Sequence, residues 1–221
     1  MGVALSAHKL TDGVLDSTLL RNEPVQARSA ARLTGLLDAA AAVVDEIGYE
    51  RLTTAMVAER AGASIGTVYR YFPDRIVVLQ GLSARLLSDL LKSLGEIYLD
   101  PKHSTLAELL AAAHQGVVTA YRSVPGFRSL RFGDSLDLPR SEGSKPGSVQ
   151  LAAAQAEWLG DRLGLVSDDL AIDIELAMVM SDALLHRAFY SSREGEQPYI
   201  DASRAVVIDT LTAKYGNPSG R

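Results

Sequence analysis

The sequence predicts an all-α protein, and two observations lead to that prediction. Apolar residues recur at helical spacing through most of the chain, and glycines, prolines and capping residues divide the pattern into segments of helical length. No segment alternates apolar and polar residues clearly enough to be read as a strand. We therefore expect about three short helices followed by about six longer ones, without an internal repeat.

Three short helices are expected near the N-terminus. Residues 1–26 show no sustained period, and we expect a flexible arm there with a short helical patch at residues 15–20. The apolar pattern then predicts helices at residues 27–47, 55–61 and 65–71. Gly48 and Gly62 end the first two helices, and Pro73 breaks the third.

Side chains that cap helices stand where these helices begin. Thr53 and Thr54 precede the second helix and Ser64 precedes the third. Asp74 is placed to cap a long fourth helix that runs to about Leu99. The caps and the breakers therefore agree on the same boundaries.

The pattern remains helical beyond Pro101. Further helices are expected at residues 105–123, 127–135, 149–164, 168–191 and 199–215. Ser167 is expected to cap the fourth of these. Residues 137–147, with their prolines and glycines, are expected to be the least ordered internal segment, and residues 192–198 a polar loop.

Composition and charge narrow the possible function classes. The chain has 221 residues, 47% of them hydrophobic and 22% charged, which is ordinary for a globular protein. It has no cysteine, no apolar run long enough to cross a membrane and no secretion signal, so we expect a cytoplasmic protein. The net charge of -5 argues against a nonspecific coat on nucleic acid. Because residues 27–75 carry six arginines and six acids, any DNA contact must depend on where a few arginines lie.

The second and third helices have the spacing of a helix-turn-helix. Ala58 leaves room where two helices cross closely, and Gly62 allows a left-handed turn. Val68, six residues later, is expected to fill the space between the helices. Phe72 is expected to pin the third helix to the first.

The segment Gly48–Arg75 resembles the DNA-binding domain of the TetR (tetracycline repressor) family of bacterial transcription regulators. The resemblance rests on the three-helix frame and on the ending Tyr69, Phe72, Pro73 and Asp74, and it covers roughly residues 27–80. It implies a flexible arm at residues 1–26, a helix-turn-helix domain at 27–73 and a helical ligand-binding and dimerisation domain at 74–221. It also implies a transcriptional repressor that responds to a ligand. The repressor would bind a palindromic operator as a homodimer, and a small hydrophobic effector would release it from the DNA.

The resemblance also implies which residues meet DNA. Ser64 would cap the recognition helix, whose first turn would enter the major groove. Thr54, Thr67 and Tyr69 would contact phosphates, while Tyr71 would lie near the backbone or a base. Bases would be read from Ile65, Gly66 and Arg70. An arginine suits guanine through its bidentate fork. Ile65 departs from the polar or basic residue common there, and a contact with a thymine methyl group is the alternative.

Several of these residues also have a purely structural interpretation. Tyr69 and Tyr71 could equally cover the edge of the domain, and Thr53 is read as a plain helix cap. Arg60 is either part of the DNA surface or a solvated partner of Glu59 or Asp74. Only the structure can therefore separate DNA contact from a structural role for these residues.

The remaining helices would bind an effector and a second subunit. The family resemblance implies a homodimer through the last two helices, about residues 168–191 and 199–215. The apolar residues expected to face the partner are Ala171, Ile174, Ala177, Met178, Ser181, Leu184 and Leu185 on the first of these helices, and Val206, Ile208, Leu211 and Ala213 on the last. Residues that could line an effector pocket are His114, Tyr121, Phe127, Arg128, Phe132, Trp158, Met178 and His186.

An enzyme and a protein-interaction module are the alternatives to a regulator. The four histidines have no metal-ligand spacing, and the chain contains neither a nucleophile elbow nor a phosphate-binding loop. We therefore expect no enzyme, no metal and no cofactor other than the effector. The alternative function is a helical protein-interaction module that does not bind DNA.

Overall fold

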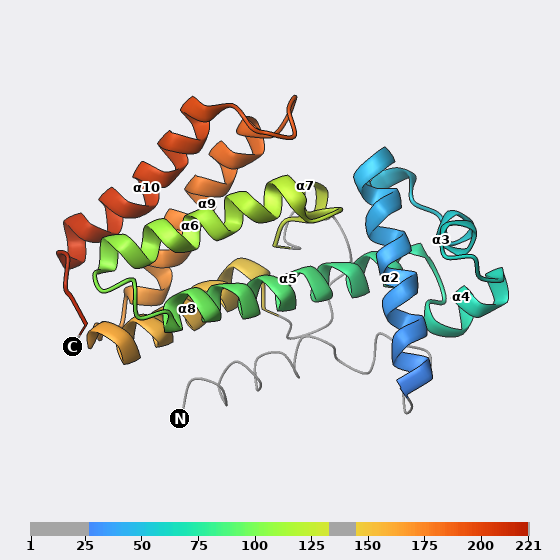
Figure 1. The fold of residues 1–221 in the computed structure, drawn as a ribbon, viewed down its shortest axis with the longest axis horizontal. Helices are drawn as coiled ribbons and strands as arrows, with labels where there is room; N and C mark the ends of the chain where they lie inside the picture. The colour runs from blue at the N-terminus through green and yellow to red at the C-terminus, as the bar shows by residue number, and fades with distance from the viewer. Residues whose placement is uncertain (1–26, 133–144, 221) are drawn as a thin grey trace. The chain divides into compact units, whose positions relative to one another are not determined.

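The computed structural model describes residues 27–132 and 145–220, and the secondary structure of these residues is helical (Figure 1). The elements are α2 (Ala27–Ile47), the 3-10 turn η2 (Tyr49–Arg51), α3 (Thr54–Arg60), α4 (Ile65–Tyr71), α5 (Arg75–Leu99), α6 (Leu106–Ser123), α7 (Phe127–Leu130), α8 (Gly147–Leu163), α9 (Leu170–Ala188) and α10 (Gln197–Tyr215). Within the described ranges β pairing is limited to an isolated bridge between Thr105 and Ser219. The predicted all-α class is confirmed.

Most of the predicted helix boundaries agree with the structure. Helices α2 and α4 have the expected bounds, and α5 begins where Asp74 accepts hydrogen bonds from the amides of Ile76 and Val77 at 2.8 and 3.0 Å. Thr105 caps α6 in a capping box with Glu108. The predicted arm at residues 1–26 and its helical patch lie outside the described residues, as does most of segment 137–147.

Predicted boundaries in α9 and α7 were wrong by a few residues. Helix α9 begins at Leu170 rather than at residue 168, because Ser167 forms a turn that accepts from the amides of Asp169 and Leu170. It also ends at Ala188, three residues before the expected end. Helix α7 stops at Leu130 because Arg131 adopts a positive φ of 47°, which no α-helix accommodates.

The chain divides into two compact units. Among the described residues, one unit contains residues 27–88 and 125–132, and the other contains 89–124 and 145–220. Helix α5 therefore contributes its first part to one unit and its second part to the other. The division at residue 73 into a DNA-binding and an effector-binding domain remains a prediction.

The first unit is built around α2. Val57, Val68 and Phe72 are fully buried, and they join α3 and α4 to the core formed with α2 and α5. Gly81 on α5 lets the ring of Phe72 approach closely, since a Cβ at this position would lie 3.3 Å from that ring. Phe72 is therefore a core residue, as predicted.

The second unit is a helical bundle in which α9 packs against both α8 and α10. Helix α10 also packs against α6, and Figure 1 shows these elements running side by side. The C-terminal segment closes the start of α6, because Pro218 and Asn217 accept hydrogen bonds from the amides of Leu106 and Ala107. Exposed N–H groups at a helix start are thereby satisfied.

Candidate DNA-binding surface and effector region

Helices α3 and α4 are held together by the residues that the sequence singled out. Gly62 adopts a φ of +59° in the turn between them, and Ala58 is 5% exposed at their crossing. Val68 is completely buried. This left-handed turn strains any residue with a Cβ, so glycine is the residue that fits there.

Hydroxyl side chains cap both helices of this pair. Thr53 accepts a hydrogen bond from the amide of Met56 at 3.2 Å, and Ser64 accepts one from the amide of Thr67 at the same distance. The Ser64 and Thr67 hydroxyl groups also lie 2.9 Å apart. Thr53 is therefore a helix cap, as expected, and Ser64 fixes the start of α4 and orients Thr67 beside it.

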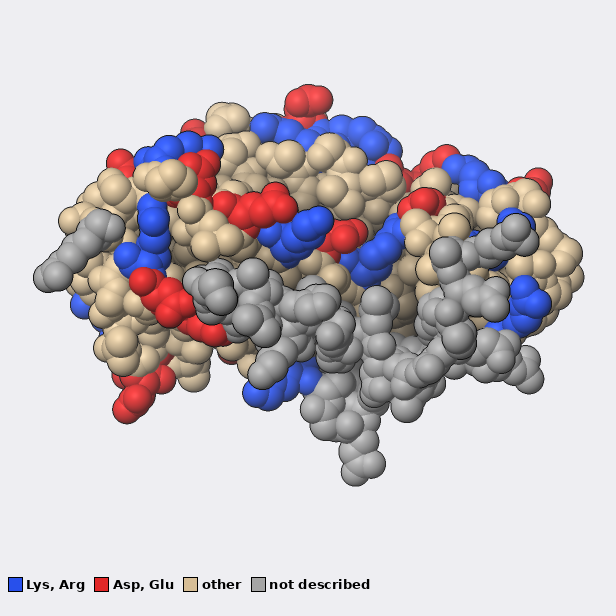
Figure 2. Space-filling model, turned by 60° about the horizontal axis from the view of Figure 1, so that its bottom comes forward, with Lys and Arg blue, Asp and Glu red and all other residues tan. Residues whose placement is uncertain are grey.

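The outward face of α4 combines apolar and polar groups. Ile65 and Tyr69 are each 43% exposed, and Gly66 and Arg70 are exposed between them. The hydroxyl of Thr54 on α3 donates to the hydroxyl of Tyr69 at 3.4 Å, which brings two of the predicted phosphate contacts together. On the part of the face in Figure 2 that belongs to described residues, Lys and Arg side chains are interspersed with Asp and Glu.

Tyr71 does not face outward, although the family resemblance implied that it lies near the DNA. Its side chain is 3% exposed, and its hydroxyl lies 2.9 Å from the hydroxyl of Ser29 on α2. Tyr71 comes three residues after the buried Val68 and so shares its face of the helix. That spacing was visible in the sequence and could have identified Tyr71 as a core residue.

Arg60 and Arg75 of this unit both have structural partners. Arg60 forms an exposed ion pair with Glu46 of α2 at 2.5 Å, rather than with Glu59 or Asp74. This ion pair lowers the pKa of Glu46 and raises that of Arg60. Arg75 donates to the backbone carbonyl of Glu50 at 2.7 Å and so ties α5 to the η2 turn, a role the sequence did not reveal.

The eight residues predicted for an effector pocket are divided between the two units. Phe127, Arg128 and Phe132 belong to the first unit. Arg128 forms an ion pair with Asp45 at 3.2 Å, and Asp45 also accepts from the amide of Gly126. The rings of Phe127 and Phe132 meet edge to face at 6.4 Å. The ion pair of Arg128 and the Gly126 amide thus tie α7 and the turn before it to α2.

The other five predicted pocket residues belong to the second unit, where each has different contacts. Tyr121 is buried, stacks on Phe189 and donates to Asp182 at 2.7 Å. The sulfur of Met178 accepts from the side-chain amide of Gln155. His186 lies on the exposed side of α9, and Trp158 is buried on α8.

His114 is a buried, neutral histidine. Its Nε2 lies 2.7 Å from the hydroxyl of Ser203, which links α6 to α10, and Ser203 in turn donates to the carbonyl of Ile200. Burial, and secondly the nearby Arg204, lower the pKa of His114 to about 4. The ring is therefore uncharged near pH 7 and is not a cationic anchor for an acidic ligand.

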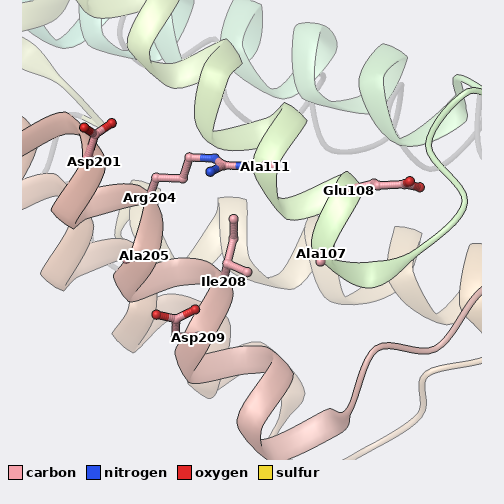
Figure 3. Close-up of a pocket in the computed structure, with 8 residues that line it drawn as sticks. All are labelled: Ala107, Glu108, Ala111, Asp201, Arg204, Ala205, Ile208 and Asp209. Carbon is pink, nitrogen blue, oxygen red and sulfur yellow. The ribbon is translucent and has the colours of Figure 1, made fainter. Parts of the chain in front are cut away.

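Among the described residues of the second unit, one hollow lies between α6 and α10 and another between α5 and α8. A groove of about 450 Å³ between α6 and α10 is lined by Ala107, Glu108, Ala111, Asp201, Arg204, Ala205, Ile208 and Asp209 (Figure 3). In that view Arg204 reaches across from α10 toward Ala111. A smaller cavity of about 170 Å³ is lined by Tyr98, Leu99, Trp158, Asp161 and Arg162. Of these lining residues, Trp158 was predicted to line an effector pocket and Ile208 to face a partner subunit.

The described part of the chain contains no cluster of His, Asp or Glu side chains arranged to hold a metal ion. Within the same ranges no helix is both long and apolar enough to cross a membrane. A carboxylate in the first turn of α9 has structural partners on α10. Asp173 on α9 bonds to Tyr215 and forms an ion pair with Lys214 at 2.7 Å, both on α10, and these contacts lower its pKa.

Two family models match the chain. The model described as bacterial regulatory proteins, tetR family, matches residues 36–79, which include α3 and α4. The model described as tetracyclin repressor-like, C-terminal domain, matches residues 104–215. Together the two matches extend from α2 to the end of α10.

Individual proteins show similarity of different extents. The transcriptional repressor KstR of Rhodococcus jostii is 34% identical over 80 residues, which is 36% of this chain and 38% of that protein. The chain thus matches less than two fifths of the length of this curated relative.

Solved structures share more of the fold. A TetR-family transcriptional regulator from Streptomyces coelicolor superimposes with a TM-score of 0.69 and 27% identity, over 84% of this chain and 98% of the other. The complex of SmeT with triclosan gives a TM-score of 0.51 and 21% identity over 83% of this chain and 91% of that one, which indicates a shared fold. SmeT is described as the repressor of a multidrug efflux pump of Stenotrophomonas maltophilia.

Proposed function

The chain belongs to the TetR family of bacterial regulatory proteins, and on that premise we propose that it is a transcriptional repressor controlled by a small hydrophobic effector. It binds a palindromic operator as a homodimer in the cytoplasm and leaves the operator when the effector binds. The observation that carries this proposal is the outward face of α4, where polar and apolar groups project from a helix that is rigidly packed from behind.

The proposed DNA contacts divide into two kinds. Thr54, Thr67 and Tyr69 carry hydroxyl groups that suit phosphate oxygens, and Ser64 orients the start of the helix. Arg70 and Ile65 are the base readers, through a guanine edge and a thymine methyl group respectively, while Gly66 allows close approach. Tyr71 supports this face from behind rather than touching the duplex.

The proposed dimer uses α9 and α10. On α9, Ile174, Ala177, Ser181 and Leu185 are buried within the subunit, so most of the face that the sequence assigned to the partner is already occupied. A second apolar face remains on the same helix. Ile172, Leu176, Val179 and Met180 are between 47% and 57% exposed. Four large apolar side chains at helical spacing on one surface favour contact with another protein chain.

A dimer also matches the operator geometry. One recognition helix reads few base pairs, whereas two helices related by a two-fold axis read half-sites about 34 to 36 Å apart, or a multiple of that distance. Helix α5 is continuous between Arg75 and Leu99 and contributes to both compact units. An effector that favours a different position of α5 would shift the population toward a state in which the two recognition helices no longer match the grooves.

The test is a gel-shift titration with the DNA upstream of the protein's own gene. A repressor of this kind should bind that DNA and lose affinity steeply as salt is added. The logarithm of the binding constant should fall with the logarithm of the salt concentration, with a slope of about -0.9 for each phosphate neutralised. The test variant Tyr69→Phe keeps the ring but removes the hydroxyl that lies beside Thr54. It should weaken binding to every DNA sequence. Absence of a shift over that DNA at low salt would favour the interaction module instead.

A further inference from the structure

The smaller cavity of the second unit lies where the end of α5 meets the end of α8. Tyr98 and Leu99 come from α5, and Trp158, Asp161 and Arg162 come from α8. Its volume of about 170 Å³ is several times the roughly 30 Å³ that a water molecule occupies in the liquid. It is smaller than the roughly 300 to 1,000 Å³ of pockets for drug-sized ligands, so its occupant must be small.

The α5 side of the cavity is lined by the aromatic ring of Tyr98, whose hydroxyl already has a hydrogen-bond partner. The ring of Tyr98 packs against that of Trp158 with 5.3 Å between centroids. The Tyr98 hydroxyl donates to Oε1 of Gln155 at 2.8 Å. Burial raises the pKa of Tyr98, so this hydroxyl remains protonated and engaged with the glutamine.

On the α8 side, two buried hydrogen-bond donors lack acceptors among the residues that the structure describes. Trp158 is 3% exposed, and its indole Nε1–H has no partner. The Nε–H of Arg162 is likewise buried and unpaired, although the same side chain donates through Nη2 to the carbonyls of Asp100 and His103. A buried donor without an acceptor is costly, and native proteins rarely leave two of them in residues that line one cavity.

We propose that this cavity binds a small organic acid whose carboxylate accepts hydrogen bonds from Arg162 Nε and Trp158 Nε1 and whose apolar part packs against Tyr98 and Leu99. A carboxylate is favoured because both unpaired groups are donors and one belongs to a guanidinium. Asp161, the negative residue of the lining, is exposed, and water and salt weaken its repulsion there. That the acid is the effector rests on the proposed function; that it binds here does not.

The chain supplies its own probe of this cavity, because Trp158 is its single tryptophan. We would titrate the full-length protein with benzoate, and separately with toluene, which keeps the ring but lacks the acceptor. Tryptophan emission would report binding to the unmodified protein and calorimetry would report it for each variant. The variants are Arg162→Lys, which keeps the charge, and Trp158→Phe, which keeps an aromatic ring. Arg85→Lys is the matched control, because Arg85 also has a buried unpaired Nε but lies outside this lining.

We expect saturable binding of benzoate with a Kd on the order of 1 mM or tighter and much weaker binding of toluene. Arg162→Lys and Trp158→Phe should each weaken benzoate about tenfold, which corresponds to about 1.4 kcal/mol, while Arg85→Lys should leave the Kd unchanged. Thermal unfolding of each variant checks that it folds; if Arg162→Lys does not, Trp158→Phe and toluene decide the test.

Three results would overturn the proposal: no saturable binding of benzoate up to about ten times that Kd, equal affinity for toluene, or unchanged affinity in both cavity variants. The first would mean that water alone fills the cavity. Because these titrations contain no DNA, benzoate can bind even if the gel shift fails. The gel shift can likewise succeed even if benzoate does not bind. Failure of the cavity proposal is therefore distinguishable from failure of the proposed repressor function.

Discussion

Tyr69 and Tyr71 allow one substitution to be compared at two positions with opposite roles. Replacing tyrosine by phenylalanine removes a hydroxyl and keeps the ring. At Tyr71 the lost group is part of a partly buried hydrogen bond to Ser29 at 2.9 Å, in a side chain that is 3% exposed. At Tyr69 the side chain is 43% exposed, and its hydroxyl lies beside Thr54 on the outward face.

The structure sets the expected magnitudes. A neutral hydrogen bond contributes about 0.5 to 1.5 kcal/mol to stability, so Tyr71→Phe should lower the free energy of unfolding by about 1 kcal/mol. For a chain of this size that corresponds to a decrease in Tm of about 2 to 4 °C. Tyr69→Phe should leave Tm nearly unchanged and instead cost about 1.5 to 3 kcal/mol in operator affinity, as expected for a bond to a charged phosphate.

Two assays separate the effects: thermal unfolding followed by circular dichroism, and operator affinity measured at a temperature where both variants are folded. The result that would refute our reasoning is a Tyr71→Phe variant with unchanged Tm and weakened DNA binding. That outcome would return Tyr71 to the DNA surface and would mean that its contact with α2 opens when the duplex binds. A Tyr69→Phe variant with full affinity would remove Tyr69 from the phosphate contacts.

Three further predictions concern other parts of the chain. Arg70→Ala should relax base preference at one position by about 1 to 3 kcal/mol, measured against a set of operators with single base changes; equal weakening for all of them would indicate a phosphate contact. Leu176→Glu should convert the dimer to monomers in sedimentation experiments, whereas Val166→Glu, at an 89% exposed loop position, should not. The pKa of His114 is lowered from 6.5 to about 4 in the folded state, so between these pH values the unfolded chain binds a proton that the folded chain does not. As the pH decreases from about 6.5 to 4, the free energy of unfolding should therefore decrease by roughly 3 kcal/mol in total. His114→Gln should remove most of that pH dependence in denaturant titrations, and a slope that persisted would assign it to other groups.

The predicted effector residues show where sequence patterns stop being informative. Trp158 was identified as a bulky residue of a middle helix, and it does line a cavity. Arg128 was an equally reasonable anchor, but it pairs with Asp45, 83 positions earlier in the chain. Arg162 was not singled out, because nothing in its local pattern reveals that its Nε–H is buried without an acceptor.

Helix α9 gives a second example of the same limit. The sequence predicted an apolar helix able to meet a partner, and the helix is apolar enough to have two such faces. Which face is used within the subunit depends on the packing of α8 and α10 against it, and that packing buries Ile174 and Ala177 while leaving Leu176 and Val179 exposed. Helical periodicity describes one chain segment and contains no information about which neighbour covers it.

The sequence by itself determined the all-helical class, the caps at Thr53, Ser64 and Asp74, and the turn at Gly62, because each depends on residues within a few positions of one another. Only the tertiary structure decided that the hydroxyl of Tyr71 meets that of Ser29, 42 positions away, and that two residues with buried unpaired donors line one small cavity among the described residues. Burial and hydrogen-bond partners at such separations follow from how helices pack, and packing depends on the whole chain at once.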